Sequence, residues 1–195
     1  MLPNTLIRSY LLALEDLLGE NGVKAFLNHS SLSGWIESYP LANDSREVTY
    51  EEFSLLQKSV EDIYGERMGR NLARRASRRS LEQVGLALIS IEEISNEHAS
   101  PEATLKHSLR AFARLFSIED LDQIRLGQSD DEIVLAFDRC PNCVGRTVDE
   151  PMCQACIGWI EALLSERDPG GRYEVIETGC LAAGDTSCTF SIRPT

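Results

Sequence analysis

The sequence lacks several features that would assign it to a common class of protein. It has no apolar run of about twenty residues, which a membrane-spanning helix needs, and its N-terminus has no signal-peptide pattern. Basic residues are outnumbered, with 19 Lys and Arg against 31 Asp and Glu and a net charge of -12. This balance argues against a nucleic-acid partner, because nucleic-acid-binding domains carry a basic footprint. We therefore expect a cytoplasmic protein with neither a membrane nor a nucleic-acid partner.

Familiar catalytic signatures are missing as well. The chain has no glycine-rich fingerprint for a dinucleotide. It also has no Ser/His/Asp or Cys/His arrangement that would suit nucleophilic catalysis. These gaps favour a binding module over an enzyme.

Cysteine is absent from the first 139 residues and then occurs six times. Cys140/Cys143 and Cys153/Cys156 form two C-x-x-C pairs, and a third pair, Cys180 and Cys188, flanks a glycine-containing turn. In a cytoplasmic protein, cysteines at C-x-x-C spacing bind metals or react with oxidants more often than they form structural disulfides. We therefore expect a metal or redox site here, although cysteine also occurs simply as a small buried hydrophobe.

The length of 195 residues suits one domain with an appendage, and we expect a helical extension over 1–47 and a domain over 48–195. Helical spacing of apolar residues predominates up to about residue 118, and we expect Gly19 to end the first helix and Gly65 to break or bend a later one. Thr49 and Glu52 match a capping box at the start of one helix. The second half alternates between strands and one helix, which predicts an α/β (α+β) fold with helices packed on an antiparallel sheet. The expected strands are Glu132–Asp138, Arg172–Thr178 and Cys188–Ile192, and the expected helix is Cys156–Ser165.

Two sets of four residues are candidate ligands for one Zn²⁺ ion, which binds four ligands in a tetrahedron. The first set joins the two C-x-x-C pairs, because a tight turn points both of its thiolates at the same place. The second set adds a carboxylate from the last hairpin, and residue spacing alone does not choose between the two. An iron–sulfur cluster also uses four thiolates and is the alternative to zinc. The first set is Cys140, Cys143, Cys153 and Cys156, and the second is Cys153, Glu177, Cys180 and Cys188.

The C-terminal cysteine segment resembles the 4-vinyl reductase domain family, also described as hydrocarbon-binding or aromatic-sensor domains. The family motif places a cysteine after P-x, then a glycine, then E-x-x-C-x-A-x-G-x-x-x-C-x-F. A weaker match lies at Tyr64-Gly65-Glu66-Arg67. The residues that carry the main resemblance are Pro151, Met152, Cys153, Gly158, Glu177 to Cys180, Ala182, Gly184 and Cys188 to Phe190.

This resemblance implies an α/β fold similar to a subunit of the eukaryotic vesicle-tethering transport particle. It also implies a structural zinc ion held by Cys153, Glu177, Cys180 and Cys188, with an apolar ligand in a nearby pocket. Family members commonly form dimers, and a leucine-rich face on the N-terminal helix suggests a homodimer here. The chain departs from the aromatic-sensing branch through its additional Cys140, Cys143 and Cys156.

Three functions follow from these observations. The first is a zinc-stabilised module that binds or senses an apolar small molecule such as an aromatic, a fatty chain or a tetrapyrrole-like pigment precursor. The second is a reductase or accessory factor in tetrapyrrole (bacteriochlorophyll) metabolism, for which an iron–sulfur cluster would supply the redox chemistry. The third is a scaffold or assembly protein, by analogy with the tethering subunit. Candidate pocket residues are Trp159, Ile160, Phe112 and Phe116, which helical spacing explains equally well as core.

Overall fold

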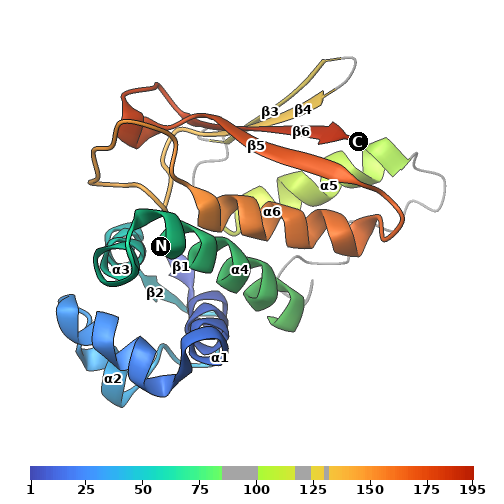
Figure 1. Ribbon diagram of the computed structural model, residues 1–195. Coiled ribbons are helices and arrows are strands. Elements are labelled where there is room, and N and C mark those ends of the chain that lie inside the picture. Colours follow the sequence, from blue (N-terminus) through green and yellow to red (C-terminus); the bar gives the residue numbers. More distant parts are fainter. Residues whose placement is uncertain (85–100, 117–123, 130–131) are drawn as a thin grey trace.

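The computed structural model describes residues 1–84, 101–116, 124–129 and 132–195. It confirms the α/β architecture, with helices packed against one antiparallel sheet (Figure 1). The helices are α1 (Asn4–His29), α2 (Gly34–Glu37), α3 (Tyr50–Tyr64), α4 (Glu66–Val84), α5 (Pro101–Arg114), α6 (Gln154–Arg167) and the short 3-10 helix η4 (Leu181–Ala183). The strands are β1 (Leu2–Pro3), β2 (Arg46–Val48), β3 (Ile124–Ser129), β4 (Glu132–Phe137), β5 (Tyr173–Gly179) and β6 (Cys188–Pro194).

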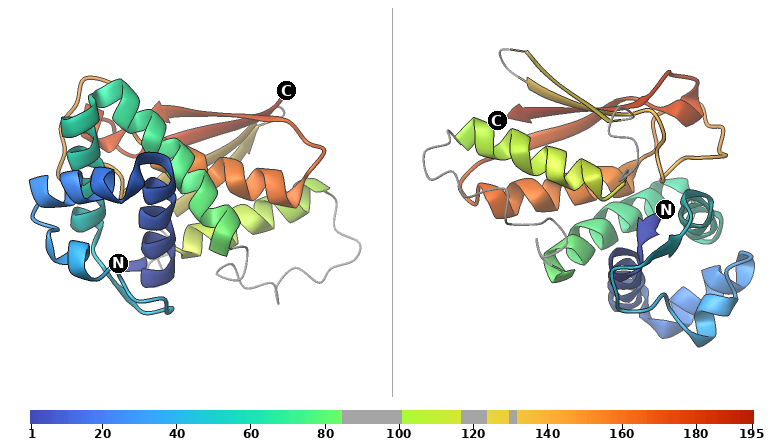
Figure 2. Two further views of the ribbon diagram at one scale, coloured as in Figure 1. Left: turned by 60° about the horizontal axis from the view of Figure 1, so that its bottom comes forward. Right: turned by 180° about the vertical axis from the view of Figure 1, so that it is seen from behind.

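The main sheet has four antiparallel strands in the order β3-β4-β6-β5. Strands β4, β5 and β6 were expected from the sequence, whereas β3 was not. Both further views show α5 and α6 beneath one face of this sheet, with α4 packed on the far side of α6 (Figure 2). In β5, Val175 and Glu177 point to the buried face while Glu174 and Ile176 are exposed, as a period of two requires.

Two glycines that were both expected to interrupt helices do so in the fold. Gly65 separates α3 from α4 at a φ of 80°, as expected of a glycine that breaks a helix. Gly19 was expected to end the first helix. It has a φ of 73° and a ψ of 162°, which lie outside the helical region, and it divides α1 into two helical parts at a kink. The apolar residues on both sides of the kink are buried, and this packing keeps both halves helical.

The capping box at the start of α3 is confirmed. The Thr49 side chain accepts a hydrogen bond from the Glu52 backbone N–H at 3.1 Å, and the Glu52 carboxylate accepts one from the Thr49 backbone N–H at 2.7 Å. These bonds satisfy two backbone donors that the first turn of a helix otherwise leaves free. The cap therefore fixes where α3 begins, directly after β2.

The apolar core is continuous from the first helix to the last strand. The leucine-rich face of α1 packs inside the chain, against α3 and α4, so the face that suggested a dimer is already covered. Residues of the first 47 positions and of the rest of the chain contribute to the same buried cluster. Among the described residues, no helix has the length and apolar character that crossing a membrane requires.

Helices α4 and α6 cross at very short range. A Cβ atom placed on Gly158 of α6 would lie 2.2 Å from the backbone oxygen of Arg74 on α4. Glycine at this position therefore lets the two backbones touch. An ion pair stabilises the crossing, because the Glu161 carboxylate on α6 accepts hydrogen bonds from the Arg74 guanidinium on α4.

Candidate metal centre

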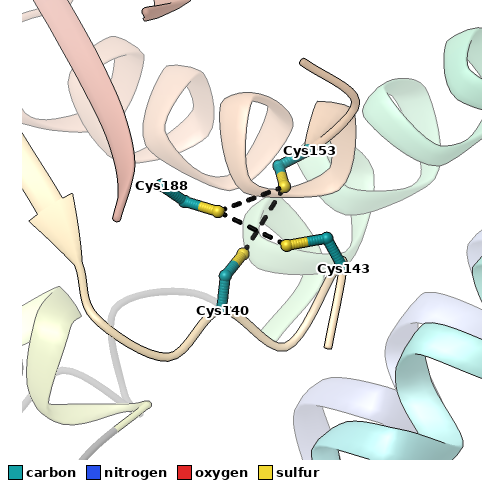
Figure 3. Close-up of side chains that lie close together, drawn as sticks. All are labelled: Cys140, Cys143, Cys153 and Cys188. Atoms are coloured by element: carbon teal, nitrogen blue, oxygen red, sulfur yellow. Dashed lines mark hydrogen bonds between the residues drawn. The ribbon is translucent and has the colours of Figure 1, made fainter. Parts of the chain in front are cut away.

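All six cysteines lie in one buried cluster between the sheet and the start of α6. Cys156 lies within α6, and three other segments carry the remaining five cysteines. The loop after β4 carries Cys140 and Cys143, Cys153 immediately precedes α6, and the β5–β6 hairpin supplies Cys180 and Cys188. Figure 3 shows the sulfur atoms of Cys140, Cys143, Cys153 and Cys188 pointing toward one another.

The loop after β4 has the backbone of a metal-binding knuckle. The Cys140 carbonyl accepts from the Val144 N–H at 3.2 Å, and the Cys143 carbonyl accepts from the Arg146 N–H at 3.0 Å. Gly145 has a φ of 74°, a conformation that residues with a Cβ rarely adopt. This tight turn aims both thiols in the same direction, as the C-x-x-C spacing predicts.

The hairpin loop between β5 and β6 is a second tight turn. The Cys180 carbonyl accepts from the backbone N–H groups of Ala183 and Asp185, and Gly184 adopts a φ of 96°. The Asp185 carboxylate in turn accepts from the Cys180 N–H at 2.7 Å. Sequence reasoning did not single out Asp185, although an acid after a glycine in a turn is typical of such side-chain-to-backbone bonds.

Neighbouring sulfur atoms lie at a nearly uniform spacing. A disulfide bond would bring two sulfurs to about 2.05 Å, so these are free thiols in van der Waals contact. Zinc binds thiolates at about 2.3 Å in a tetrahedron, which places its sulfur ligands about 3.8 Å apart. The Sγ–Sγ distances are 3.4 Å for Cys143–Cys188, 3.6 Å for Cys140–Cys153, 3.7 Å for Cys140–Cys156 and Cys153–Cys188, and 3.8 Å for Cys153–Cys180.

Two overlapping groups of four ligand atoms, each group within 4.8 Å, could hold a metal ion. One group contains the residues that the family resemblance implies. The other keeps three members of the two-knuckle set, but Cys188 stands in place of Cys156. The first group is Cys153, Glu177, Cys180 and Cys188, and the second is Cys140, Cys143, Cys153 and Cys188.

Glu177 is an acid on the buried face of β5. One of its carboxylate oxygens accepts from the Cys153 backbone N–H at 2.7 Å, while the other, Oε1, is buried without a hydrogen-bond partner among the described residues. Leaving a buried carboxylate oxygen unpaired is costly. Coordination of a cation by Oε1 would remove that cost, so the donor set fits a metal ion.

The surroundings of the cluster shift the pKa values of its thiols and of its carboxyl. Burial raises the pKa of the Cys140 and Cys153 thiols. Burial and the adjacent Cys180 raise the pKa of the Glu177 carboxyl to about 8. Hydrogen bonds from neighbouring thiols, Cys140 first, lower the pKa of Cys143 instead. Thiols and a carboxyl packed together in an apolar space cannot all ionise, because each negative charge disfavours the next. A bound dication would favour the ionised forms, because metal ligands must be deprotonated.

Two supporting contacts were not foreseen from the sequence. Asn142, inside the first knuckle, accepts from the Ala155 N–H at 3.0 Å and so ties the knuckle to the first turn of α6. Arg146 donates hydrogen bonds from its two terminal guanidinium nitrogens to the Glu61 carboxylate of α3, at 2.7 and 3.0 Å. Both side chains are largely buried. Only the fold brings Glu61 to the knuckle, so no local signal could have identified this pair.

The four predicted pocket residues all lie in the core. Trp159 is fully buried and contacts the rings of Tyr10, Phe53 and Phe116 at centroid distances of 5.2 to 6.4 Å. A cleft of about 330 Å³ lies elsewhere, along α1 and α2. It includes none of the predicted pocket residues, and its lining, which includes Arg8, Glu15, Glu20 and Lys24, is largely charged and polar.

Comparison with protein families identifies the segment that carries the candidate metal centre. Residues 133–194 match the family model of the 4-vinyl reductase domain. This match confirms the resemblance that the cysteine motif suggested. The matched residues, called the 4-vinyl reductase segment below, run from β4 to the end of β6 and include all six cysteines and Glu177. A search of curated proteins found no match.

Solved structures share the fold over a longer span. A structure from a study of heme distortion in the H-NOX family aligns at a TM-score of 0.62 and 14% identity, covering 99% of this chain and 94% of that chain. A mutant H-NOX of T. Tengcongensis aligns at 0.61 and 14%, covering 99% and 96%. The phenol-responsive sensory domain of the transcription activator PoxR, with phenol, aligns at 0.54 and 13%, covering 79% of each chain. At these identities the likeness concerns the fold.

Proposed function

We propose that this chain is a sensory module that binds a small aromatic molecule in its core and is held together by zinc at the cysteine centre. The observation that carries the ligand proposal is the ring cluster around Trp159. This cluster joins the helical layer, which consists of α1, α3 and α4, to the 4-vinyl reductase segment. Tyr10 and Phe53 come from α1 and α3, while Trp159 comes from α6. The cleft along α1 and α2 does not reach these rings, so a small aromatic molecule would bind by displacing ring contacts, which would couple the two parts.

Polar groups at the cluster would supply specificity. The Tyr10 hydroxyl is paired with Gln57, and the Trp159 indole N–H donates to Ser80 at 3.1 Å. All four of these side chains are buried. Sites for small molecules combine mostly apolar and aromatic walls with a few such polar groups. Two kinds of structural neighbour on this fold are described with a ligand, phenol in one case and heme in the other, which supports the proposal.

Zinc is the metal that the donors favour. The four residues Cys153, Glu177, Cys180 and Cys188 offer three thiolates and a carboxylate, a closed set without a place for substrate, which is typical of structural zinc. An iron–sulfur cluster spreads its four thiolates over several iron atoms. The set here instead includes the carboxylate of Glu177, an oxygen donor that zinc accepts beside thiolates. We further propose that the module is a binding protein of the cytoplasm and a homodimer, whose interface uses a surface other than the covered leucine-rich face of α1.

Trp159 offers a direct test of ligand binding, because the chain has only two tryptophans. In a Trp35→Phe variant, Trp159 is the single tryptophan and reports on the ring cluster. We expect phenol or hemin to change its emission in a saturable way and to raise the melting temperature. The matched control, Trp159→Phe, keeps Trp35 on α2 and should show no saturable change. If neither probe alters emission or melting temperature, the module does not bind such ligands.

A further inference from the structure

The two ligand groups of the cysteine centre are not alternatives, because they share two residues. Cys153 and Cys188 belong to both, and their sulfurs lie 3.7 Å apart. We propose that the centre is binuclear, with two zinc ions bridged by these two thiolates. Cys140 and Cys143 complete the shell of one ion, and Glu177 and Cys180 complete the shell of the other. This proposal builds on the zinc centre of the proposed function and is independent of any ligand in the core.

The number of donors supports two ions. Zinc in structural sites takes four ligands. Two tetrahedra that share an edge use six ligands in total, which is the number that the two groups contain together. Among the described residues, no group within 4.8 Å contains all six, because the terminal ligands of each ion fall in different groups. A single ion would leave two buried donors beside it without a metal.

One helix N-terminus and one backbone N–H lie beside the shared edge. Cys153 is the N-cap of α6, so its sulfur lies at the positive end of that helix. The Cys188 sulfur accepts from the Leu181 backbone N–H at 3.3 Å. Five thiolates and one carboxylate carry six negative charges, of which one dication neutralises two and two dications neutralise four. Two ions, together with the Leu181 N–H and the positive end of α6, therefore compensate a buried charge that one ion would leave largely unbalanced.

Cys156 provides a matched control within the same cluster. Its sulfur lies 3.7 Å from that of Cys140, yet it belongs to neither ligand group. It is as deeply buried as the proposed ligands, at 1% exposure. Loss of its thiol should therefore test packing alone and not metal binding.

Metal content is the first measurement. The wild-type chain, purified with zinc and freed of excess metal, should hold two zinc ions per chain by elemental analysis and by native mass spectrometry. X-ray absorption at the zinc edge should show metal–metal scattering, which two mononuclear sites without shared ligands would lack. One ion per chain without metal–metal scattering would overturn the binuclear centre while leaving the zinc of the proposed function intact. No zinc at all would remove both.

Variants then assign the ligands. The pair Cys140→Ser/Cys143→Ser should keep one zinc, and so should the pair Glu177→Gln/Cys180→Ser. Cys188→Ser should lose both, whereas Cys156→Ser should keep both. Loss of an ion from Cys156→Ser, or retention of both by either pair, contradicts the proposed ligand sets. If a variant does not fold by circular dichroism, stepwise release of zinc from the wild type to a colorimetric chelator distinguishes two ions from one.

Discussion

The helical layer and the cysteine centre are both buried, but different forces hold them. In the helical layer, α1, α3 and α4 satisfy their own backbone groups and bury side chains such as Leu11 and Phe53 completely. Around the metal centre, residues 138–153 are all described and contain no helix or strand. The shape of this segment depends on turn hydrogen bonds and on the thiols. On the proposed function, metal ligation would do for this segment what regular secondary structure does for the helices.

Removal of the metal should have the largest effect and should separate the two regions. Structural zinc contributes on the order of 10 kcal/mol to folding. We expect a strong chelator to lower the melting temperature steeply, and limited proteolysis to cut first within 139–152. The helices α1, α3 and α4 should be cut last. Equal melting temperatures and equal cleavage with and without chelator would show that packing alone holds the centre.

Loss of the ion pair between Glu61 and Arg146, which joins the two regions, should cause the second-largest loss of stability. Glu61→Gln leaves the guanidinium of Arg146 largely buried and without its charged partner, which we expect to cost about 3 kcal/mol of unfolding free energy. Denaturant titration in zinc-saturated buffer measures this cost. Glu82→Gln is the matched control, because Glu82 and its partner Arg78 are both exposed, at 48% and 49%. Its cost should stay below about 0.5 kcal/mol, and equal costs for the two variants would contradict the role of Glu61.

Adding a methyl group at the contact between α4 and α6 should have an intermediate effect on stability. Gly158→Ala places a methyl group against the Arg74 carbonyl, and overpacking of this kind costs about 1–3 kcal/mol. Gly170→Ala is the control, because nothing lies within 4 Å of a Cβ at that turn. The difference between their denaturation midpoints measures how tightly the 4-vinyl reductase segment is docked on the helical layer. Identical midpoints would mean that the helices move apart at little cost.

The cap of α3 should show the smallest effect. Thr49→Ala removes the side-chain oxygen that accepts from Glu52, at a cost of about 1 kcal/mol. Thr49→Ser keeps that oxygen and should lose much less. Thermal melts of the two variants make the comparison, and the zinc content of both should equal that of the wild type. A change in zinc content would show that the two regions are coupled more tightly than the structure suggests.

Much of the fold was predictable because its signals are local. The capping box of α3, the helix break at Gly65 and the strands β4, β5 and β6 all follow from residues a few positions apart. The family motif covers only the last third of the chain and correctly identified it as a 4-vinyl reductase domain. The interruption at Gly19 is equally local, because glycine adopts a positive φ without steric cost. Val23 and Phe26 beyond it are buried and hold the second part of α1 against the core.

The order of residues along the chain was enough to place six cysteines in one region and to predict a knuckle at Cys140 and Cys143, which depends on the backbone of a few neighbouring residues. Glu177 became a candidate ligand through the family resemblance, since residue spacing alone did not choose it. Folding in three dimensions was needed to select Cys188 rather than Cys156 for the group with the knuckle, and to bring Glu61 to Arg146. These contacts join segments that are distant along the chain, and their geometry is set by the register of the hairpin and the docking of α6.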